Sequence, residues 1–414
     1  MPQHRHAAML LAALIGVVAA CDDAPPTAAP PPQGSVPAPD LVVAAGPVGS
    51  PLPGLTAEQQ LQFDIGSGVF QIEFTPETGV GPLFNAVGCA ACHEEPVVGG
   101  GGSNDPEEGG EDLENHATAF HGGGTCDDLG STGGPVVQKQ VTPALHDALL
   151  IDAEPFPPAA TDSGHRTTPD VFGFGLLDAV PEAVILLRAD PFDVNGDGIS
   201  GRPHRLSDGR IGRFGRKAQA ATLREFNIDA FVMEMGVTNP GNQTEQTVGG
   251  NPLPEGVDPL PEPEISQEQF DAANAFVRFL APPPRLPLDL IGAVGAVVFA
   301  NIGCASCHVP ALVTGPSRVA ALNFKVVPAF TDLLLHNMGP ELADICLGNA
   351  RPAEFRTEPL MGLRFVSAFL HDGRAATIGQ AIRMHGGEGT AARRRFVQLS
   401  IFERAALMRF LRSL

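Results

Sequence analysis

The chain has 414 residues, and its 47 acidic and 26 basic side chains give a formal net charge of −21 at pH 7. This charge excludes a general nucleic-acid-binding role, because a phosphate backbone would be repelled rather than neutralised. The sequence contains neither tryptophan nor tyrosine, so no tyrosinate can ligate a metal and neither ring can relay an electron hole.

The N-terminus carries the features of a secretion signal. An apolar run from Met9 to Ala20 is too short to span a bilayer but has the length of a signal-peptide core, so residues 1–20 are expected to be removed on export. Small residues precede Cys21 and resemble the bacterial lipobox, in which that cysteine is lipidated and becomes the mature N-terminus. The alternative is ordinary cleavage near Ala20, which would release the protein.

Residues 21–53 are rich in alanine and proline and show no hydrophobic period. Such a segment cannot bury a core and is expected to form an extended, lipid-anchored tether. No later segment contains about 18 uninterrupted apolar residues, so the N-terminal lipid is the only membrane contact we expect. The predicted location is the periplasm or the cell surface.

Capping boxes predict the first helices. Thr56 and Gln59 match this pattern and predict a helix that ends near Phe70. Ser266 and Gln269 match it again and begin a second helix. The predicted apolar face of that second helix comprises Phe270, Ala273, Val277 and Leu280.

Two copies of C-x-x-C-H provide the strongest functional signal in the chain. They are Cys89-Ala-Ala-Cys92-His93 and Cys304-Ala-Ser-Cys307-His308. In this motif two thiols add to the vinyl groups of one haem, and the adjacent histidine offers an imidazole nitrogen to the iron. A redox dithiol or half of a zinc site would not explain a histidine directly after both motifs. The sequence therefore predicts two covalently bound haem c groups.

The second half of the chain repeats this layout. A helix over residues 289–301 is expected to lead into the second motif, and a capping box at Ser400 and Glu403 is expected to begin the last helix. The predicted face of that last helix comprises Ile401, Ala405, Met408 and Leu411.

The run Pro282–Pro284 is the expected domain boundary. We therefore predict a haem domain with insertions over residues 54–285 and a cytochrome c domain over residues 286–414. Strand signals are weak and scattered, so the predicted fold is mainly α, with two cytochrome c-like haem domains and long irregular loops.

Several stretches resemble the bacterial di-haem oxidoreductase family, whose members are described as peroxidases and often labelled thiol oxidoreductases. The resemblance to the di-haem cytochrome c peroxidases is more distant. The stretches are residues 81–85, 173–182, 193–203, 212–215, 332–340 and 369–374. The resemblance covers residues 54–414.

The resemblance implies a distal ligand for the C-terminal haem. In the peroxidases this ligand lies on a helix soon after a Phe-x-His-Asp-Gly stretch, and the matching position here is His385. The alternatives are a surface histidine at a helix end, or ligation by Met338, Met361 or Met384. A bis-histidine iron would accept electrons less readily from a high-potential donor than an iron with a methionine ligand.

For the N-terminal haem, the resemblance implies a substrate-facing role with His93 on one side of the iron. His116 and His121, expected on a flexible segment, either close the other face reversibly or are solvated loop residues. Peroxide cleavage needs a group that moves a proton, and Glu182 is the carboxylate we select. The alternative is that Glu182 forms a structural ion pair.

Asp193, Asn195 and Asp197 match the first half of a calcium-binding loop. Position 12 of that loop is His204 instead of a glutamate, so the pattern is incomplete. The loop is either a Ca²⁺ site that borrows a ligand from elsewhere or a turn rich in Asx residues. Related di-haem peroxidases place calcium between their haems.

Two further cysteines remain after Cys21 and the four haem cysteines. Cys126 and Cys346 can pair only with each other, and export to an oxidising compartment favours a disulfide between the two predicted domains. The alternative is a pair of buried free thiols.

The sequence thus predicts an exported di-haem c-type cytochrome that acts as a peroxidase-like oxidoreductase. The main alternative is a pure electron carrier in which both irons have six ligands. A thiol oxidase finds no support, since the only spare cysteines are far apart in the chain. The expected partner is a donor or acceptor cytochrome or cupredoxin, basic in view of the acidic chain.

Overall fold

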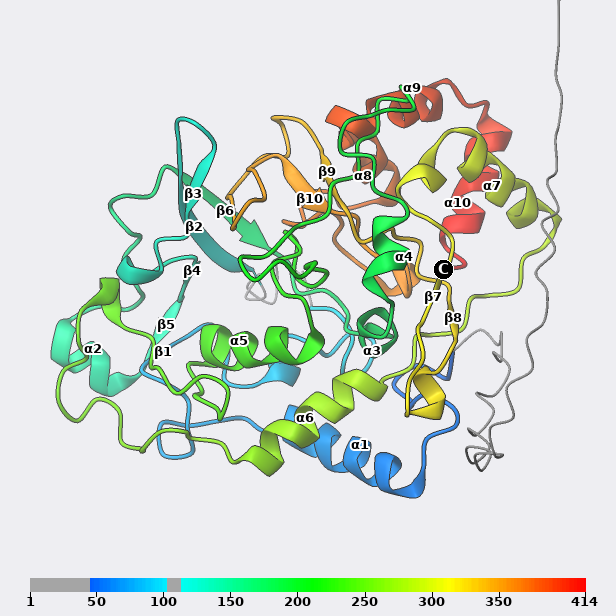
Figure 1. Ribbon diagram of the computed structural model, residues 1–414. Helices are drawn as coiled ribbons and strands as arrows, with labels where there is room; N and C mark the ends of the chain where they lie inside the picture. The colour runs from blue at the N-terminus through cyan, green and yellow to red at the C-terminus, as the bar shows by residue number, and fades with distance from the viewer. Residues whose placement is uncertain (1–44, 103–112) are drawn as a thin grey trace, which may run out of the picture. The chain divides into compact units, whose positions relative to one another are not determined.

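The computed structural model describes residues 45–102 and 113–414 (Figure 1). The predicted signal peptide, the lipidation site at Cys21 and most of the predicted tether lie outside the described residues.

Helices and short strands alternate along the chain. The helices are α1 (Ala57–Phe70), α2 (Pro143–Leu149), α3 (Phe174–Asp178), α4 (Glu182–Leu186), α5 (Leu223–Met235), α6 (Gln267–Phe279), α7 (Leu290–Asn301), α8 (Ile378–Met384), α9 (Thr390–Gln398) and α10 (Ile401–Leu411). The strands are β1 (Leu83–Phe84), β2 (Glu114–His121), β3 (Thr125–Asp127), β4 (Val136–Val137), β5 (Gln140–Val141), β6 (Asp162–Arg166), β7 (Leu312–Val313), β8 (Val326–Val327), β9 (Leu335–Asn337) and β10 (Glu354–Arg356).

The prediction of a mainly α fold is wrong. Helix accounts for 32% of the described residues and strand for 13%, the latter in several small sheets. Most of these strands have two or three residues, which is too short for an alternating pattern of apolar and polar side chains to show in the sequence.

The helices predicted from caps are confirmed. The Thr56 hydroxyl accepts the Gln59 amide, and the Gln59 side chain accepts the Thr56 amide, at the start of α1. Ser266 and Ser400 begin α6 and α10 with the same reciprocal arrangement. Asp289 caps α7 through the amide of Gly292. These caps satisfy backbone donors that a helix start leaves unpaired.

Two helix crossings are built in the same way (Figure 1). α1 packs against α6, and a Cβ atom at Gly66 would overlap the carbonyl oxygen of Ala272. α7 packs against α10, and a Cβ atom at Gly295 would overlap the carbonyl oxygen of Ala406. Because only glycine permits so close a backbone approach, the helix that precedes each C-x-x-C-H motif is held directly against a later helix.

The buried face of α10 differs from the predicted one. Its buried residues are Ala406, Leu407, Phe410 and Leu411. Ile401, the first residue of the predicted face, is 90% exposed. The close approach of α7 at Ala406 turns this side of α10 inward, so of the predicted stripe only Leu411 is buried.

The largest sheet centres on β2, which pairs antiparallel with β3, β4 and β6. This strand carries His116 and His121, so the prediction that they lie on a flexible segment is wrong. The glycine-rich sequence that suggested a loop is instead the turn between β2 and β3, where Gly123 and Gly124 adopt positive φ angles of 97° and 87°. His116 is buried, whereas His121 is exposed at the end of the strand.

The predicted disulfide is confirmed. Cys126 in β3 is bonded to Cys346, with 5.8 Å between their Cα atoms. Cys346 lies between β9 and β10, and its amide donates to the Thr118 hydroxyl of β2. The bond therefore joins segments 220 positions apart.

Buried apolar side chains form several clusters. The largest takes residues from both predicted haem domains, including Phe63, Phe276, Leu312 and Leu334. Another lies between α7 and α10 around Phe299. Within the described ranges, no helix combines the length and apolar character needed to cross a membrane.

The glycine crossings generate a matched pair of substitutions within α1. Gly66→Ala forces α1 away from α6 and should destabilise the fold by about 1–3 kcal/mol. Gly68→Ala, two residues later, meets open space and should stabilise the helix by roughly 0.5–1 kcal/mol. Thermal unfolding followed by circular dichroism measures both changes. Equal shifts of the same sign would contradict the crossing.

Candidate haem sites

Each C-x-x-C-H motif forms a short 3₁₀ turn, over Cys89–Ala91 and Cys304–Ser306. The second turn follows α7 almost directly, and Gly303 between them has a φ of 96°, which permits the sharp change of direction. Burial raises the pKa of the Cys89 and Cys304 thiols to about 12.

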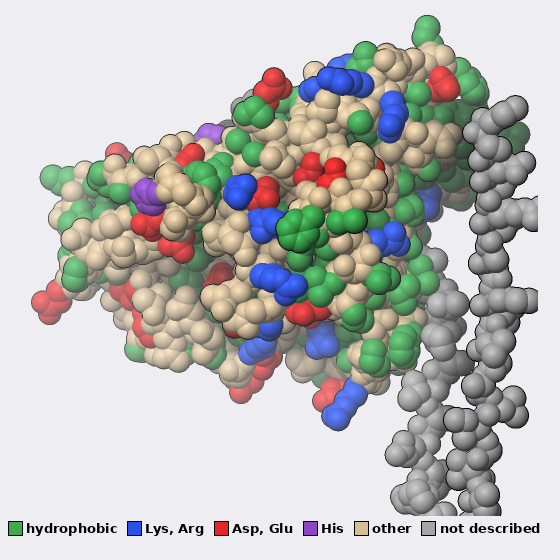
Figure 2. All heavy atoms as spheres, turned by 45° about the horizontal axis from the view of Figure 1, so that its top comes forward, with side chains coloured by type: hydrophobic (Ala, Val, Ile, Leu, Met, Phe, Trp, Pro, Cys, Tyr) green, Lys and Arg blue, Asp and Glu red, His purple; other side chains and the backbone are tan. Residues whose placement is uncertain are grey.

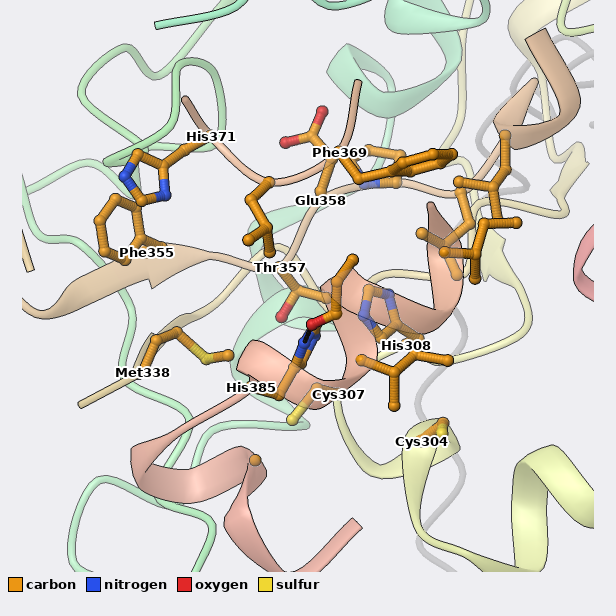
Figure 3. Close-up of a pocket in the computed structure, with 18 of the residues that line it drawn as sticks. Cys304, Cys307, His308, Met338, Phe355, Thr357, Glu358, Phe369, His371 and His385 are labelled. Carbon is orange, nitrogen blue, oxygen red and sulfur yellow. Dashed lines mark hydrogen bonds between the residues drawn. The ribbon is translucent and has the colours of Figure 1, made fainter. Parts of the chain in front are cut away.

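A cavity of about 380 Å³ surrounds the second motif. Cys304, Cys307 and His308 contribute one wall, and His385 comes from the end of α8 (Figure 3). Thr377 caps the start of α8, and His385 is the residue directly after its last turn. The structure thus brings the predicted distal residue, 77 positions later in the sequence, into the same cavity as His308.

Hydrogen bonds fix both imidazoles. Nδ1 of His308 bonds the carbonyl oxygen of Phe330 at 3.0 Å, and Nδ1 of His385 bonds the carbonyl oxygen of Ala381 at 2.8 Å. Each bond leaves the opposite ring nitrogen, Nε2, to serve as a ligand. Burial, with the nearby His385 ring second, lowers the pKa of His308 to about 4, and burial lowers the pKa of His385. Both rings are therefore neutral at neutral pH, which is the form that binds a metal.

Two of the rival methionines reach the same cavity. Met338 and Met361 line it, whereas Met384 does not. Ligation of the iron by His385 stays a prediction, with these two thioethers as the available alternatives.

One wall of this cavity is charged. Glu358 forms ion pairs with Arg216 at 2.8 Å and with Arg356 at 2.9 Å. Burial alone would raise the pKa of Glu358, but the two guanidinium groups lower it. The sequence analysis did not select these residues, because their pairing joins segments that are distant in the chain.

A buried histidine in the wall of the same cavity supports the second motif. His336 lies 3.7 Å from the Cys307 sulfur and is hydrogen-bonded to Asp332 at 2.9 Å and Glu388 at 2.7 Å. Burial alone would lower the pKa of His336, but its hydrogen bonds, that to Asp332 first, raise it well above the ordinary value. This buried ion-paired ring ties the motif to β9 and to the turn before α9.

A second cavity, of about 90 Å³, lies at the first motif. Cys89, Cys92 and His93 line it. Nδ1 of His93 bonds the Gly100 carbonyl oxygen at 3.1 Å, as the equivalent nitrogen of His308 bonds Phe330. Burial lowers the pKa of His93, so this imidazole is also neutral.

Two carboxylates line the second cavity, and the sequence analysis missed both. Glu234 accepts a hydrogen bond from Asn85 at 3.0 Å. Burial, followed by the charge of Glu114, raises the pKa of Glu234 well above its ordinary value. Glu114 bonds Nε2 of His116 at 3.0 Å. One signal was present: Glu234 falls three positions after Phe231, on the buried side of α5.

Glu182, the carboxylate selected from the sequence, lines neither cavity. It is the first residue of α4, and its Oε1 accepts the Ile211 amide at 3.0 Å. In this position it holds the loop before Arg213 against α4. A catalytic role for Glu182 stays a prediction that this placement does not favour.

The oxygens of the predicted calcium loop accept amides of their own segment. Asn195 Oδ1 accepts the Asp197 amide, and Asp197 Oδ1 accepts the Ile199 amide, which is the geometry of Asx turns. Asp193 accepts the amide of Gly198. His204 is turned away and bonds the Lys217 carbonyl oxygen through Nδ1. Calcium binding itself stays a prediction.

The two cavities share one residue of their walls. Thr168 lines both, with residues 167–170 on the side of His308 and Val171 on the side of His93. The segment 167–171 therefore separates the two sites.

The residues present fit two haem groups. Each cavity presents two thiols and one neutral imidazole from a single turn, and each imidazole is fixed through Nδ1. Carbonyl-bonded Nδ1 atoms with Nε2 available are what metal-ligating histidines require. The C-terminal cavity adds a second such imidazole.

Known proteins show similarity to this chain. Residues 160–414 match the family described as "Di-haem oxidoreductase, putative peroxidase". Hydrazine synthase of Kuenenia stuttgartiensis is 13% identical, with 96% of this chain and 100% of that chain covered and a TM-score of 0.41. The diheme peroxidase BthA from Burkholderia thailandensis is 16% identical, with 91% and 92% covered and a TM-score of 0.38.

A MauG-like protein associated with microbial copper homeostasis is 14% identical, with 90% of this chain and 93% of that chain covered and a TM-score of 0.41. These structural likenesses are too remote to carry an argument about activity. Among curated proteins, none matches the chain.

Substitution of His385 separates the possible distal ligands. If its imidazole binds the C-terminal iron, His385→Ala should convert that haem from low-spin to high-spin, and His385→Met should keep it low-spin but raise its potential. Electron paramagnetic resonance and redox titration measure both effects. An unchanged spectrum in His385→Ala, together with a high-spin signal in Met338→Leu or Met361→Leu, would assign the ligand to a methionine.

Proposed function

Because the chain belongs to the di-haem oxidoreductase family, whose members carry two haems, we propose that it is an exported c-type cytochrome with peroxidase-like activity. In this proposal the N-terminal haem, at His93, faces the substrate. The C-terminal haem, between His308 and His385, transfers electrons.

The observation that carries this proposal is the difference between the two cavities. His385 gives the C-terminal cavity a second fixed imidazole, while no second histidine is found among the described residues that line the N-terminal cavity. Glu114 and Glu234 line it instead. An iron with two protein ligands suits electron transfer, and an iron with one leaves a face for a substrate.

Covalent attachment is part of the proposal. The sulfur atoms of Cys89 and Cys92 bind the first haem, and those of Cys304 and Cys307 bind the second, as C-x-x-C-H motifs do. Mass spectrometry of the intact protein counts the attached haems, and a mass without two of them would contradict this part.

The two glutamates supply the proton chemistry. When bound, haem iron provides the electrons that split the oxygen–oxygen bond of a peroxide. Cleavage also requires a proton to move from one oxygen to the other, and a carboxyl group beside the substrate performs such a transfer. The raised pKa of Glu234 keeps it protonated and able to donate, while Glu114, bonded to His116, offers an oxygen that accepts.

Electrons pass between the sites through the segment 167–171. Thr168 is common to both walls, so this stretch of main chain is the shortest connection that the two cavities share. The chain has no tryptophan or tyrosine. Electron transfer between the two haems therefore proceeds without a tryptophan or tyrosine relay.

One observation favours the second candidate, a pure electron carrier. Met235 lines the N-terminal cavity and is buried there. Its thioether would make the first iron six-coordinate and leave no face for a substrate.

We include export and lipid anchoring in the proposal because of the N-terminal sequence alone. We place the mature protein in the periplasm or at the cell surface, held by lipid on Cys21 and served by a redox partner protein. Fractionation of cells that express Cys21→Ala tests the anchor, since the variant should leave the membrane fraction.

Isosteric substitutions test the catalytic assignment. Glu234→Gln and Glu114→Gln should each lower kcat for hydrogen peroxide by about 10²-fold or more, because the proton transfer is lost. Glu255→Gln, at an exposed position, is the matched control and should keep kcat. Optical spectra of the ferric protein check that both haems remain bound. If kcat falls only in Glu182→Gln, Glu182 is the residue that transfers the proton.

A further inference from the structure

Charge is distributed unevenly along this acidic chain. Residues 378–414, which form α8, α9 and α10, carry seven arginines and two acidic residues. The whole chain has a net charge of −21. These helices therefore carry a net charge of +5 (7 − 2), opposite in sign to that of the whole chain.

Five of these arginines gather around α9, and we call them the arginine face. They are Arg383, Arg393, Arg394, Arg395 and Arg404. The guanidinium groups of Arg383 and Arg404 lie 5.6 Å and 5.4 Å from the centre of the Phe396 ring. Arg394 is exposed in the same helix. Figure 2, in which the top of Figure 1 comes forward, shows basic side chains at its upper edge beside apolar ones.

The arginine face borders the C-terminal cavity. Arg393 and Arg395 line the cavity together with Cys304. Arg395 also donates to the carbonyl oxygen of Ile302, two residues before that cysteine. The arginine face thus adjoins the second motif, whose cysteines would hold the C-terminal haem.

The positive charge of the face is not balanced locally. Among the ion pairs that the described residues form, none includes a member of the arginine face. The two acidic residues of the segment are engaged elsewhere: Glu388 binds His336 and Ser200, and Glu403 caps α10. Clustered like charges repel one another, so the arrangement favours an external anionic group.

Exposed apolar side chains adjoin the arginines. Val397 is 55% exposed, Ile401 90% and Phe402 59%, all at the junction of α9 and α10. Arg404 spans this junction by donating to the Val397 carbonyl oxygen. A small apolar centre with a charged rim is typical of surfaces that bind another protein.

We propose that the arginine face is the docking site of a redox protein whose own docking surface is acidic. This inference rests on the proposed electron-transferring role of the C-terminal haem. The net charge of the chain favours a basic partner at long range, but the charge beside this haem selects an acidic patch at contact. Complementary charge would orient the partner toward the haem edge and raise the association rate.

The test uses two probes that differ in surface charge. One is a small oxidised basic cytochrome c, and the other is the same cytochrome with its lysines succinylated, which makes its surface acidic. Stopped-flow absorbance without oxygen measures oxidation of the dithionite-reduced C-terminal haem by each probe. At an ionic strength of about 0.1 M, where a Debye length of about 10 Å screens the distant charges of the chain, the acidic probe should react faster than the basic one, and further salt should slow it. Isothermal titration calorimetry with the oxidised acidic probe measures binding without electron transfer.

Two charge reversals of equal size form the variant pair. Arg394→Glu changes an exposed residue of the face that does not line the cavity. Arg318→Glu changes an exposed residue between β7 and β8, distant from α9 in Figure 1. Arg394→Glu should lower the association rate of the acidic probe about threefold or more at low salt, and Arg318→Glu should change it much less.

The outcomes separate this inference from the proposed function. If neither probe oxidises the reduced C-terminal haem although ferricyanide does, the electron-transferring role fails. If both probes oxidise it but the basic one is faster, or the two variants behave alike, the docking inference alone is overturned. If Arg394→Glu abolishes binding to phosphatidylglycerol vesicles and leaves oxidation by the acidic probe unchanged, the face binds membranes and the docking inference is again overturned.

Discussion

A hydrogen bond from imidazole Nδ1 to a main-chain carbonyl oxygen is the interaction on which both sites depend. His93 makes it to Gly100, His308 to Phe330 and His385 to Ala381. The bond sets the plane of each ring and leaves Nε2 available to a metal. Burial keeps the rings neutral, as a ligand must be.

The rest of the fold holds these carbonyl groups and rings in place. α1 and α7 lead toward the two motifs, and glycine at each crossing brings them directly against α6 and α10. Around the second motif, His336 links Cys307 to Asp332 and Glu388. Because a misplaced carbonyl would turn a ligand away from its iron, this rigid packing bears on function as well as on stability.

The two sites start from the same motif and differ in what lies opposite it. At the C-terminal site a short capped helix delivers His385. At the N-terminal site β2 and α5 deliver Glu114 and Glu234. In the proposed function, this difference assigns electron transfer to one cavity and proton-coupled chemistry to the other, and it arises from distant segments that fold against the motif.

Local signals in the sequence predicted local structure well. Thr56, Ser266 and Ser400 mark helix starts because a cap involves residues three apart, and cysteine counting identified the Cys126–Cys346 bond. Contacts between distant segments were not predictable in this way. Most strands were too short to show a period, and β2, which has eight residues, was taken for a loop because a glycine-rich turn follows it.

The carboxylates at the His93 cavity also could not be predicted, because they reach it through contacts between distant segments. Glu182 was selected because it stands within a stretch that resembles the family. Glu114 and Glu234 reach the His93 cavity through a strand and a helix whose packing no local pattern reveals. The arginines of α8 to α10 can be counted in the sequence. Only the structure shows that the arginine face forms none of the ion pairs found among the described residues, because the acidic residues nearby are engaged elsewhere.

The central claim is that one haem is enclosed by two imidazoles and the other keeps a face for substrate. Electron paramagnetic resonance of the purified ferric protein, with the optical spectrum beside it, counts low-spin and high-spin irons. We predict one low-spin iron, at the C-terminal site, and one high-spin iron, at the N-terminal site. Two low-spin irons would contradict this account and favour a pure electron carrier.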